Sequence, residues 1–214
     1  LMQALSRQIA HAKASSPAQA ERLAGVDAAA ITSRAALAAA VLGLDIGALR
    51  KGAKAALVAT LKARTVADSP AALGAAVNLA AMRTGKGNAV LMGYGDRFER
   101  LSKWWVQLWA ESLGKDGQGT QPVAALGPVD QHSQQQLYLG GPRDKLFTVI
   151  TQSLKGLGPV MDAKLAAAAH EKDFAGKTIG DLVAAQGLAM IETFAKNGCA
   201  VRRIHIETLD AASY

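Results

Sequence analysis

The part of the sequence that decides the fold is residues 89–114, which read AVLMGYGDRFERLSKWWVQLWAESLG. The first four residues form a short, continuous apolar run of the kind found in buried strands. Apolar residues then recur every three or four positions, which predicts an amphipathic helix with one wide stripe of large buried side chains: Phe98, Leu101, Trp104, Trp105, Leu108 and Trp109. Gly114 follows, where a residue of left-handed conformation commonly ends a helix. The stretch therefore predicts a strand and the helix that follows it.

The same order of strand and helix recurs towards the C-terminus. Three more apolar runs predict strands and the segments between them predict helices: strands at 122–126, 146–150 and 201–206, and helices at 130–139, 162–173 and 178–197. Short strands alternating with helices indicate an α/β fold, in which a doubly wound parallel sheet is covered by helices on both faces. Ligands of such sheets bind beyond the carboxyl ends of the strands. In the last strand, His205 alternates with Ile204 and Ile206 and so points to the other face.

The chain before residue 85 has a different pattern and reads as mainly helical. Its periodic segments predict four helices, at 1–14, 28–42, 46–64 and 69–83. We place the boundary between the two parts at residue 64. Residues 1–64 then form a mainly helical region, and residues 65–214 form the α/β domain.

The composition is that of a soluble globular protein. Half of the 214 residues are apolar, and no apolar stretch is long enough to span a membrane. The net charge is +7, but Lys and Arg are scattered and have few aromatic neighbours, so nucleic acid is not an expected partner. The single cysteine excludes a disulfide framework, and no leader-like segment is visible, so we expect a cytoplasmic protein. No cluster of Cys, His and Asp has metal-ligand spacing, so no metal is expected.

Two motifs carry a resemblance to a known family. They are QLWAESLGK at residues 107–115 and GPVDQHSQ at residues 127–134. In this order and at this separation, they closely resemble glucose-6-phosphate isomerase of the bacterial type. The similarity continues through Pro142–Lys145 and Ile204–Leu209. It covers residues 85–214 well and the chain before them only loosely.

The resemblance implies an aldose–ketose isomerase that interconverts glucose 6-phosphate and fructose 6-phosphate in glycolysis and gluconeogenesis. Such an enzyme opens the sugar ring and moves a proton between C1 and C2 through an enediolate. Matched to the family's motifs, Glu111 is the base that carries this proton, and Gln107 contacts the substrate one helical turn earlier. His132 matches the ring-opening histidine, which the neighbouring subunit of a homodimer contributes to a shared active site. No cofactor is implied, because both sugars have the same oxidation level.

The resemblance also implies that residues 65–214 are the second sugar isomerase (SIS-like) domain, and that residues 1–64 are a linker and the end of the preceding one. Three family motifs are not found: the Ser/Thr-rich phosphate loop, the loop that supplies an arginine for the enediolate, and the C-terminal motif with the catalytic lysine. We therefore expect an incomplete chain. Two alternatives stay open. One is a non-catalytic sugar-phosphate-binding regulatory module of the same fold, and the other is a structural domain in which Glu111 and His132 are surface residues.

Overall fold

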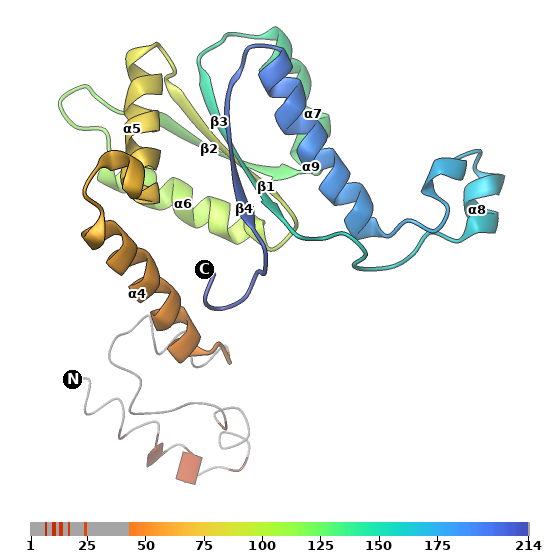
Figure 1. The fold of residues 1–214 in the computed structure, drawn as a ribbon, viewed down its shortest axis with the longest axis horizontal. Helices are drawn as coiled ribbons and strands as arrows, with labels where there is room; N and C mark the ends of the chain where they lie inside the picture. The colour runs from red at the N-terminus through yellow and green to blue at the C-terminus, as the bar shows by residue number, and fades with distance from the viewer. Residues whose placement is uncertain are drawn as a thin grey trace. The chain divides into compact units, whose positions relative to one another are not determined.

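The computed structural model describes residues 43–213 without a gap, and before them only positions 7, 10, 11, 13, 14, 17 and 24 (Figure 1). The helix expected at 28–42 lies outside the described residues, as does most of the one expected at 1–14. The chain forms two compact units, Leu1–Ser69 with Leu209–Tyr214 and Pro70–Thr208. All candidate site residues belong to the second unit.

The long helix of the first unit is α4, Ile46–Lys62. It begins at a capping residue, because the Asp45 side chain accepts a hydrogen bond of 2.9 Å from the Ala48 amide. It ends two residues earlier than expected, since Ala63 already has an extended backbone. A single 3-10 turn, η2 (Val66–Asp68), follows it.

The second unit is built on a four-stranded parallel sheet. In the spatial order β2-β1-β3-β4, the strands are Gln121–Gly127, Asn88–Tyr94, Lys145–Gln152 and Ala200–Ile206. All four strands lie where apolar runs predicted them. The two central strands, β1 and β3, are buried on both faces and therefore need continuous apolar residues. The predicted α/β class is confirmed.

Helices cover both faces of this sheet (Figure 1). α6 (Phe98–Ser112) connects β1 to β2, whereas α7 (Val129–Gly140) and α9 (Ile179–Lys196) connect β2 to β3 and β3 to β4. The first connection moves one way along the strand order and the other two move the opposite way. Right-handed crossovers therefore place α6 on one face and α7 and α9 on the other. The direction reverses between β1 and β3, which makes this pair the switch point of the sheet.

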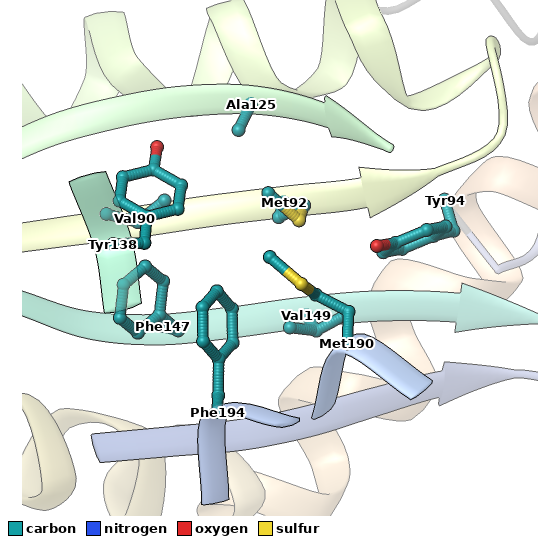
Figure 2. Packing of buried hydrophobic residues seen from close by; sticks show 9 residues of the cluster. All are labelled: Val90, Met92, Tyr94, Ala125, Tyr138, Phe147, Val149, Met190 and Phe194. Atoms are coloured by element: carbon teal, nitrogen blue, oxygen red, sulfur yellow. The ribbon is translucent and has the colours of Figure 1, made fainter. Parts of the chain in front are cut away.

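The main hydrophobic core lies on the face covered by α7 and α9 (Figure 2). Phe194 of α9 stacks on Phe147 of β3 with ring centroids 4.0 Å apart, and Tyr138 of α7 meets Phe147 edge-on at 4.9 Å. Such pairs contribute about 0.5–1.5 kcal/mol each beyond their buried area. The remaining members of the cluster come from three strands and α9: Val90, Met92, Tyr94, Ala125, Val149 and Met190.

The opposite face packs against α6, and a half-buried arginine connects it to α5 (Pro70–Arg83). Arg202 of β4 donates from Nη1 to the Gly74 carbonyl (3.0 Å) and from Nε to Thr148 Oγ1 (2.8 Å), which links α5 to β3 and β4. Gly93 of β1 lies very close to Phe98 of α6. A Cβ atom at Gly93 would come within 2.4 Å of the Phe98 Cβ, so the glycine is needed for this close approach.

The burial of α6 differs from the predicted apolar stripe. Its buried residues are Phe98 and Ser102, while Trp104 is 56% exposed and Leu108 is 42% exposed. The expectation that the whole stripe is buried is therefore wrong. The physical reason is geometric: α6 packs mainly over β2 and β1, and the apolar stripe is wider than the surface that these two strands cover.

The helix expected at 162–173 is also shorter than predicted. α8 spans only Ala163–Ala168, and a 3-10 turn, η3 (Lys172–Phe174), follows it. His170 between them has a left-handed backbone (φ 59°), which interrupts the helix. Ala166 is the one buried residue of α8, so this segment buries too little apolar surface to stabilise more turns. No described helix is both long and apolar enough to cross a membrane.

Candidate active site

Glu111 and Gln107 lie together near the C-terminal end of α6. Their four-residue spacing places both side chains on one side of the helix, and Gln107 Nε2 donates to Glu111 Oε1 at 3.0 Å. Both residues are exposed. The other carboxylate oxygen, Oε2, makes no hydrogen bond to any residue that the structure describes. A carboxylate that is oriented through one oxygen and open at the other can take a proton from a bound molecule.

The helix end that carries Glu111 is anchored by Trp109. Its indole Nε1 donates to Thr120 Oγ1 at 3.1 Å, and its ring packs against Trp105 with centroids 5.2 Å apart. Thr120 directly precedes β2. The segment between α6 and β2 turns at Gly114. Its φ of +90° agrees with the left-handed helix end predicted from the sequence. Trp109 therefore fixes the last turns of α6 to the start of the next strand.

His132 lies in the first turn of α7 and is exposed. The residues beside it are held by the sheet. Asp130 Oδ2 accepts a bond of 2.7 Å from the Leu126 amide of β2, and Gln131 Oε1 accepts one of 2.6 Å from the Tyr94 hydroxyl of β1. Burial raises the pKa of Tyr94 well above its ordinary value, so its hydroxyl stays a donor. The backbone that carries His132 is thus fixed on two strands while the imidazole faces solvent.

The structure brings Gln107 and Glu111 together but separates both from His132. α6 starts after the carboxyl end of β1 and returns to the amino end of β2, so Glu111 lies at the amino edge of the sheet. α7 begins directly after β2, so His132 lies at the carboxyl edge. A strand of seven residues spans about 20 Å. Glu111 and His132 of the same chain are therefore too far apart to contact one small molecule.

The sequence did not predict the pocket that the second unit contains. This pocket, of about 300 Å³, lies at the carboxyl edge among residues that include Tyr94, Thr151, Arg203 and His205. None of the three predicted site residues lines it. His205 does point to the face opposite Ile204, as predicted. Polar residues follow the apolar run of β3 and alternate with apolar ones in β4, and this pattern could have indicated a polar site. The residues that hydrogen-bond between these two segments are more than fifty positions apart in the sequence, so no local pattern links them.

The described part of the chain holds no group of three or more His, Cys, Asp or Glu side chains that could bind a metal ion. The candidate residues are instead a carboxylate, an amide and an imidazole. Such groups can move protons and orient a polar ligand without a metal. The chemistry that they support is therefore general acid–base catalysis.

Comparisons with known proteins agree on one family. The chain is 38% identical over 189 residues to the probable glucose-6-phosphate isomerase of Halobacterium salinarum, covering 86% of this chain and 42% of the relative. It is 50% identical over 115 residues to the glucose-6-phosphate isomerase of Rubrobacter xylanophilus, covering 53% of this chain and 26% of that enzyme. The chain thus spans less than half the length of these relatives. No protein-family model matches it.

A solved structure supports the fold independently of the family names. The chain is similar to the hypothetical protein TT0462 from Thermus thermophilus, with a TM-score of 0.71 and 32% sequence identity. The match covers 83% of this chain and 43% of the other. The described architecture is therefore one that an experimentally determined relative also has.

Proposed function

We infer that this chain, a homologue of part of the glucose-6-phosphate isomerases, is the segment of such an enzyme that supplies the proton-carrying base and the ring-opening histidine. The proposed reaction interconverts glucose 6-phosphate and fructose 6-phosphate. The observation that carries this proposal is the pair of Gln107 and Glu111, which the end of α6 presents to solvent with one carboxylate oxygen held and the other open. The relatives' names favour an enzyme over a non-catalytic sugar-phosphate-binding module.

The proposed reaction needs three proton movements, one in ring opening and two in the isomerisation, and together they balance. In ring opening, the bond between C1 and the ring oxygen breaks, while His132 takes the proton of the C1 hydroxyl and returns one to the ring oxygen. Glu111 then removes the proton from C2 of the open-chain aldose, and the electrons of that C–H bond form the enediolate. The same proton goes to C1, and the hydroxyl proton of C2 passes to the oxygen on C1. Glu111 ends the cycle as it began, as a carboxylate.

We also propose that the active site is shared between two copies of the chain in a homodimer. Glu111 and His132 lie at opposite edges of one sheet, so one copy cannot apply both to the same sugar. In a two-fold symmetric pair, Glu111 of one subunit can meet the partner subunit's His132, and the pair then contains two equivalent sites. Each site of the proposed dimer then combines the amino edge of one subunit's sheet with the carboxyl edge of the other's.

Mixing two inactive variants tests the shared site. Glu111→Gln and His132→Ala subunits of the complete gene product are unfolded, mixed in equal amounts and refolded, and isomerase turnover is measured. Random pairing makes half of the dimers hybrid, and each hybrid has one intact site, so about one quarter of the wild-type activity should return. Each variant refolded alone is the control. If the mixture stays as inactive as the single variants, the two residues do not come from different subunits.

Two further parts of the proposal follow from the family. We propose that residues 65–214 form the second sugar isomerase (SIS-like) domain of the enzyme and that residues 1–64 are a linker and the end of the preceding domain. We also propose a cytoplasmic location, because the sugar phosphates of glycolysis are found there. Limited proteolysis of the complete gene product would test the domain boundary, since cleavage concentrates in exposed linkers.

A further inference from the structure

The pocket at the carboxyl edge has the position expected of a ligand site. It lies beyond the ends of β1, β3 and β4, and α9 forms one wall. Tyr94 marks the end of β1 and Gln152 the end of β3, so the pocket borders the switch point of the sheet, where ligands of parallel α/β sheets bind. Its volume of about 300 Å³ is that of a site for a small molecule.

A chain of hydrogen bonds fixes the polar groups on its floor. Arg203 donates from Nε to Thr151 Oγ1 and from Nη2 to His205 Nδ1, both at 2.9 Å. Thr151 is only 5% exposed and also lies 2.9 Å from His205 Nδ1. A guanidinium has donors only, so Nδ1 of His205 accepts this hydrogen bond. The guanidinium is thereby oriented, and its Nη1 makes no hydrogen bond to a described residue.

The cluster is not a nucleophilic triad, although it contains a serine, a histidine and an acid. In a triad the acid faces Nδ1 and the serine donates to Nε2. Here Arg203 occupies Nδ1, and Glu207 Oε1 lies 3.3 Å from Nε2 on the same side as Ser153. Ser153 Oγ donates to Glu207 Oε2 at 2.8 Å and is therefore not activated by the histidine. The floor is built to present fixed donors rather than a nucleophile.

The charges that line the pocket are positive. Lys155 and Arg203 both line it, and neither forms a salt bridge within the described residues. Glu207, which bonds to Ser153 and His205 at the edge of the pocket, has a side chain that is 82% exposed and is not itself part of the lining. Two cations, one of them with the free donor Nη1 of Arg203, suit a phosphate group, which has two negative charges and several acceptor oxygens.

The loop that carries Lys155 is bonded to the start of α9. The Gly156 amide donates to Asp181 Oδ1 at 3.1 Å, and Asp181 also belongs to the capping box that starts α9. On the other wall, Val183 and Leu188 of α9 supply an apolar surface for the carbon skeleton of a ligand. A fixed loop reduces the entropy lost on binding.

We propose that this pocket binds a small phosphorylated metabolite, with the phosphate between Lys155 and Arg203 and the carbon skeleton against α9. The site is separate from Glu111, which lies at the opposite edge of the sheet. It does not depend on the proposed isomerase reaction, because it rests on the pocket's own residues.

Binding to the isotope-labelled chain tests the proposal. Glycerol 3-phosphate is titrated and the amide shifts of the Lys155 loop and of β4 are followed by NMR, with inorganic phosphate, acetate and glycerol as comparison probes. Glycerol 3-phosphate and phosphate should shift the pocket amides, and glycerol should not. Lys155→Gln should weaken binding about tenfold, since a hydrogen bond between charged groups is lost. Lys164→Gln removes the same charge from exposed α8 and should have little effect.

Further variants separate this site from the proposed active site. Glu111→Gln should leave the binding of glycerol 3-phosphate unchanged. If this variant weakened the binding, the ligand would be bound at the isomerase site instead, and the proposal would be overturned. Arg203→Gln should abolish binding, with circular dichroism to check its fold because Arg203 also supports Thr151. Equal weakening by Lys155→Gln and Lys164→Gln, binding of acetate as tight as that of phosphate, or no shift at the pocket would each contradict the proposal.

Discussion

The amino and carboxyl edges of the sheet hold their candidate residues in different ways. At the amino edge, Glu111 is oriented by Gln107 of the same helix, and Trp109 donates a hydrogen bond to Thr120, 11 residues further along the chain. At the carboxyl edge, the Tyr94 hydroxyl bonds to Gln131, and Arg203 bonds to Thr151, 52 residues away. The amino edge is thus assembled from neighbours in sequence and the carboxyl edge from separate strands. A variant at the first should act locally, whereas one at the second should also disturb the packing between elements.

The largest effect is expected at the amino edge, from Glu111→Gln in the complete gene product. The amide keeps the shape but cannot take the C2 proton, so turnover should fall about 10²–10⁴-fold while sugar-phosphate binding persists. Exchange of the C2 hydrogen with solvent measures the step directly. Glu99→Gln is the matched control, because Glu99 lies on the same helix and pairs with Lys103 at its other end. Undiminished exchange in Glu111→Gln would assign the base to another residue.

His132→Ala probes the carboxyl edge through its chemistry. Its expected effect is a loss of about 10²-fold with the cyclic sugar, since general acid–base help in ring opening disappears. An open-chain substrate analogue that cannot cyclise should lose much less. The ratio of the two rates is the informative measurement. Equal losses on both substrates would show that His132 serves a step other than ring opening.

Tyr94→Phe probes how the carboxyl edge is packed. Burial raises the pKa of Tyr94 above its ordinary value and raises the pKa of Tyr138 to about 12, with the Asp130 carboxylate adding to the latter. A tyrosine whose pKa is higher in the folded than in the unfolded protein contributes fully to the free energy of unfolding below its unfolded pKa, near pH 10. This contribution is lost as the pH rises towards the pKa of the folded state. Stability should therefore fall above about pH 10, by about 1.4 kcal/mol per pH unit for each tyrosine.

Tyr94→Phe should make that alkaline loss shallower, because one of the two titrating groups is gone. Urea unfolding at neutral pH and at about pH 11 gives the comparison. Tyr138→Phe should give a similar change that ends near pH 12. A curve for Tyr94→Phe that runs parallel to the wild-type curve would mean that the Tyr94 hydroxyl is not buried as described.

The smallest effect is expected from Trp109→Phe, which keeps an aromatic ring at the end of α6 but removes the donor to Thr120. The free energy of unfolding should fall by about 0.5–1.5 kcal/mol, the usual contribution of one hydrogen bond. Trp104→Phe is the control on the same helix, since Trp104 is 56% exposed and should cost little. An equal decrease in the free energy of unfolding in both variants would show that Trp109 does not anchor the end of α6.

The contrast between the edges also explains what could be predicted from the sequence. The four strands and the limits of α6 follow from runs and periods within a few residues, and Gln107 and Glu111 meet because four-residue spacing on a helix is itself a local rule. The exposure of Trp104 depends on how much of α6 two strands can cover. The spacing of apolar residues along the helix does not contain this information. The pocket depends on the register of β3 and β4, in which Thr151 lies opposite His205. Side chains so distant in sequence meet only after folding.

The bond from Asp181 to the Gly156 amide has a consequence for how this protein can diverge. The carboxylate holds backbone rather than a side chain, and it would hold the same backbone whatever residue stood at position 155. The path of the loop is therefore independent of the residue that faces the pocket. Substitutions at Lys155 can alter which ligands are accepted without refolding the loop, whereas a change at Asp181 disturbs both the loop and the start of α9. Ligand preference can drift among descendants of this chain while its architecture stays constant.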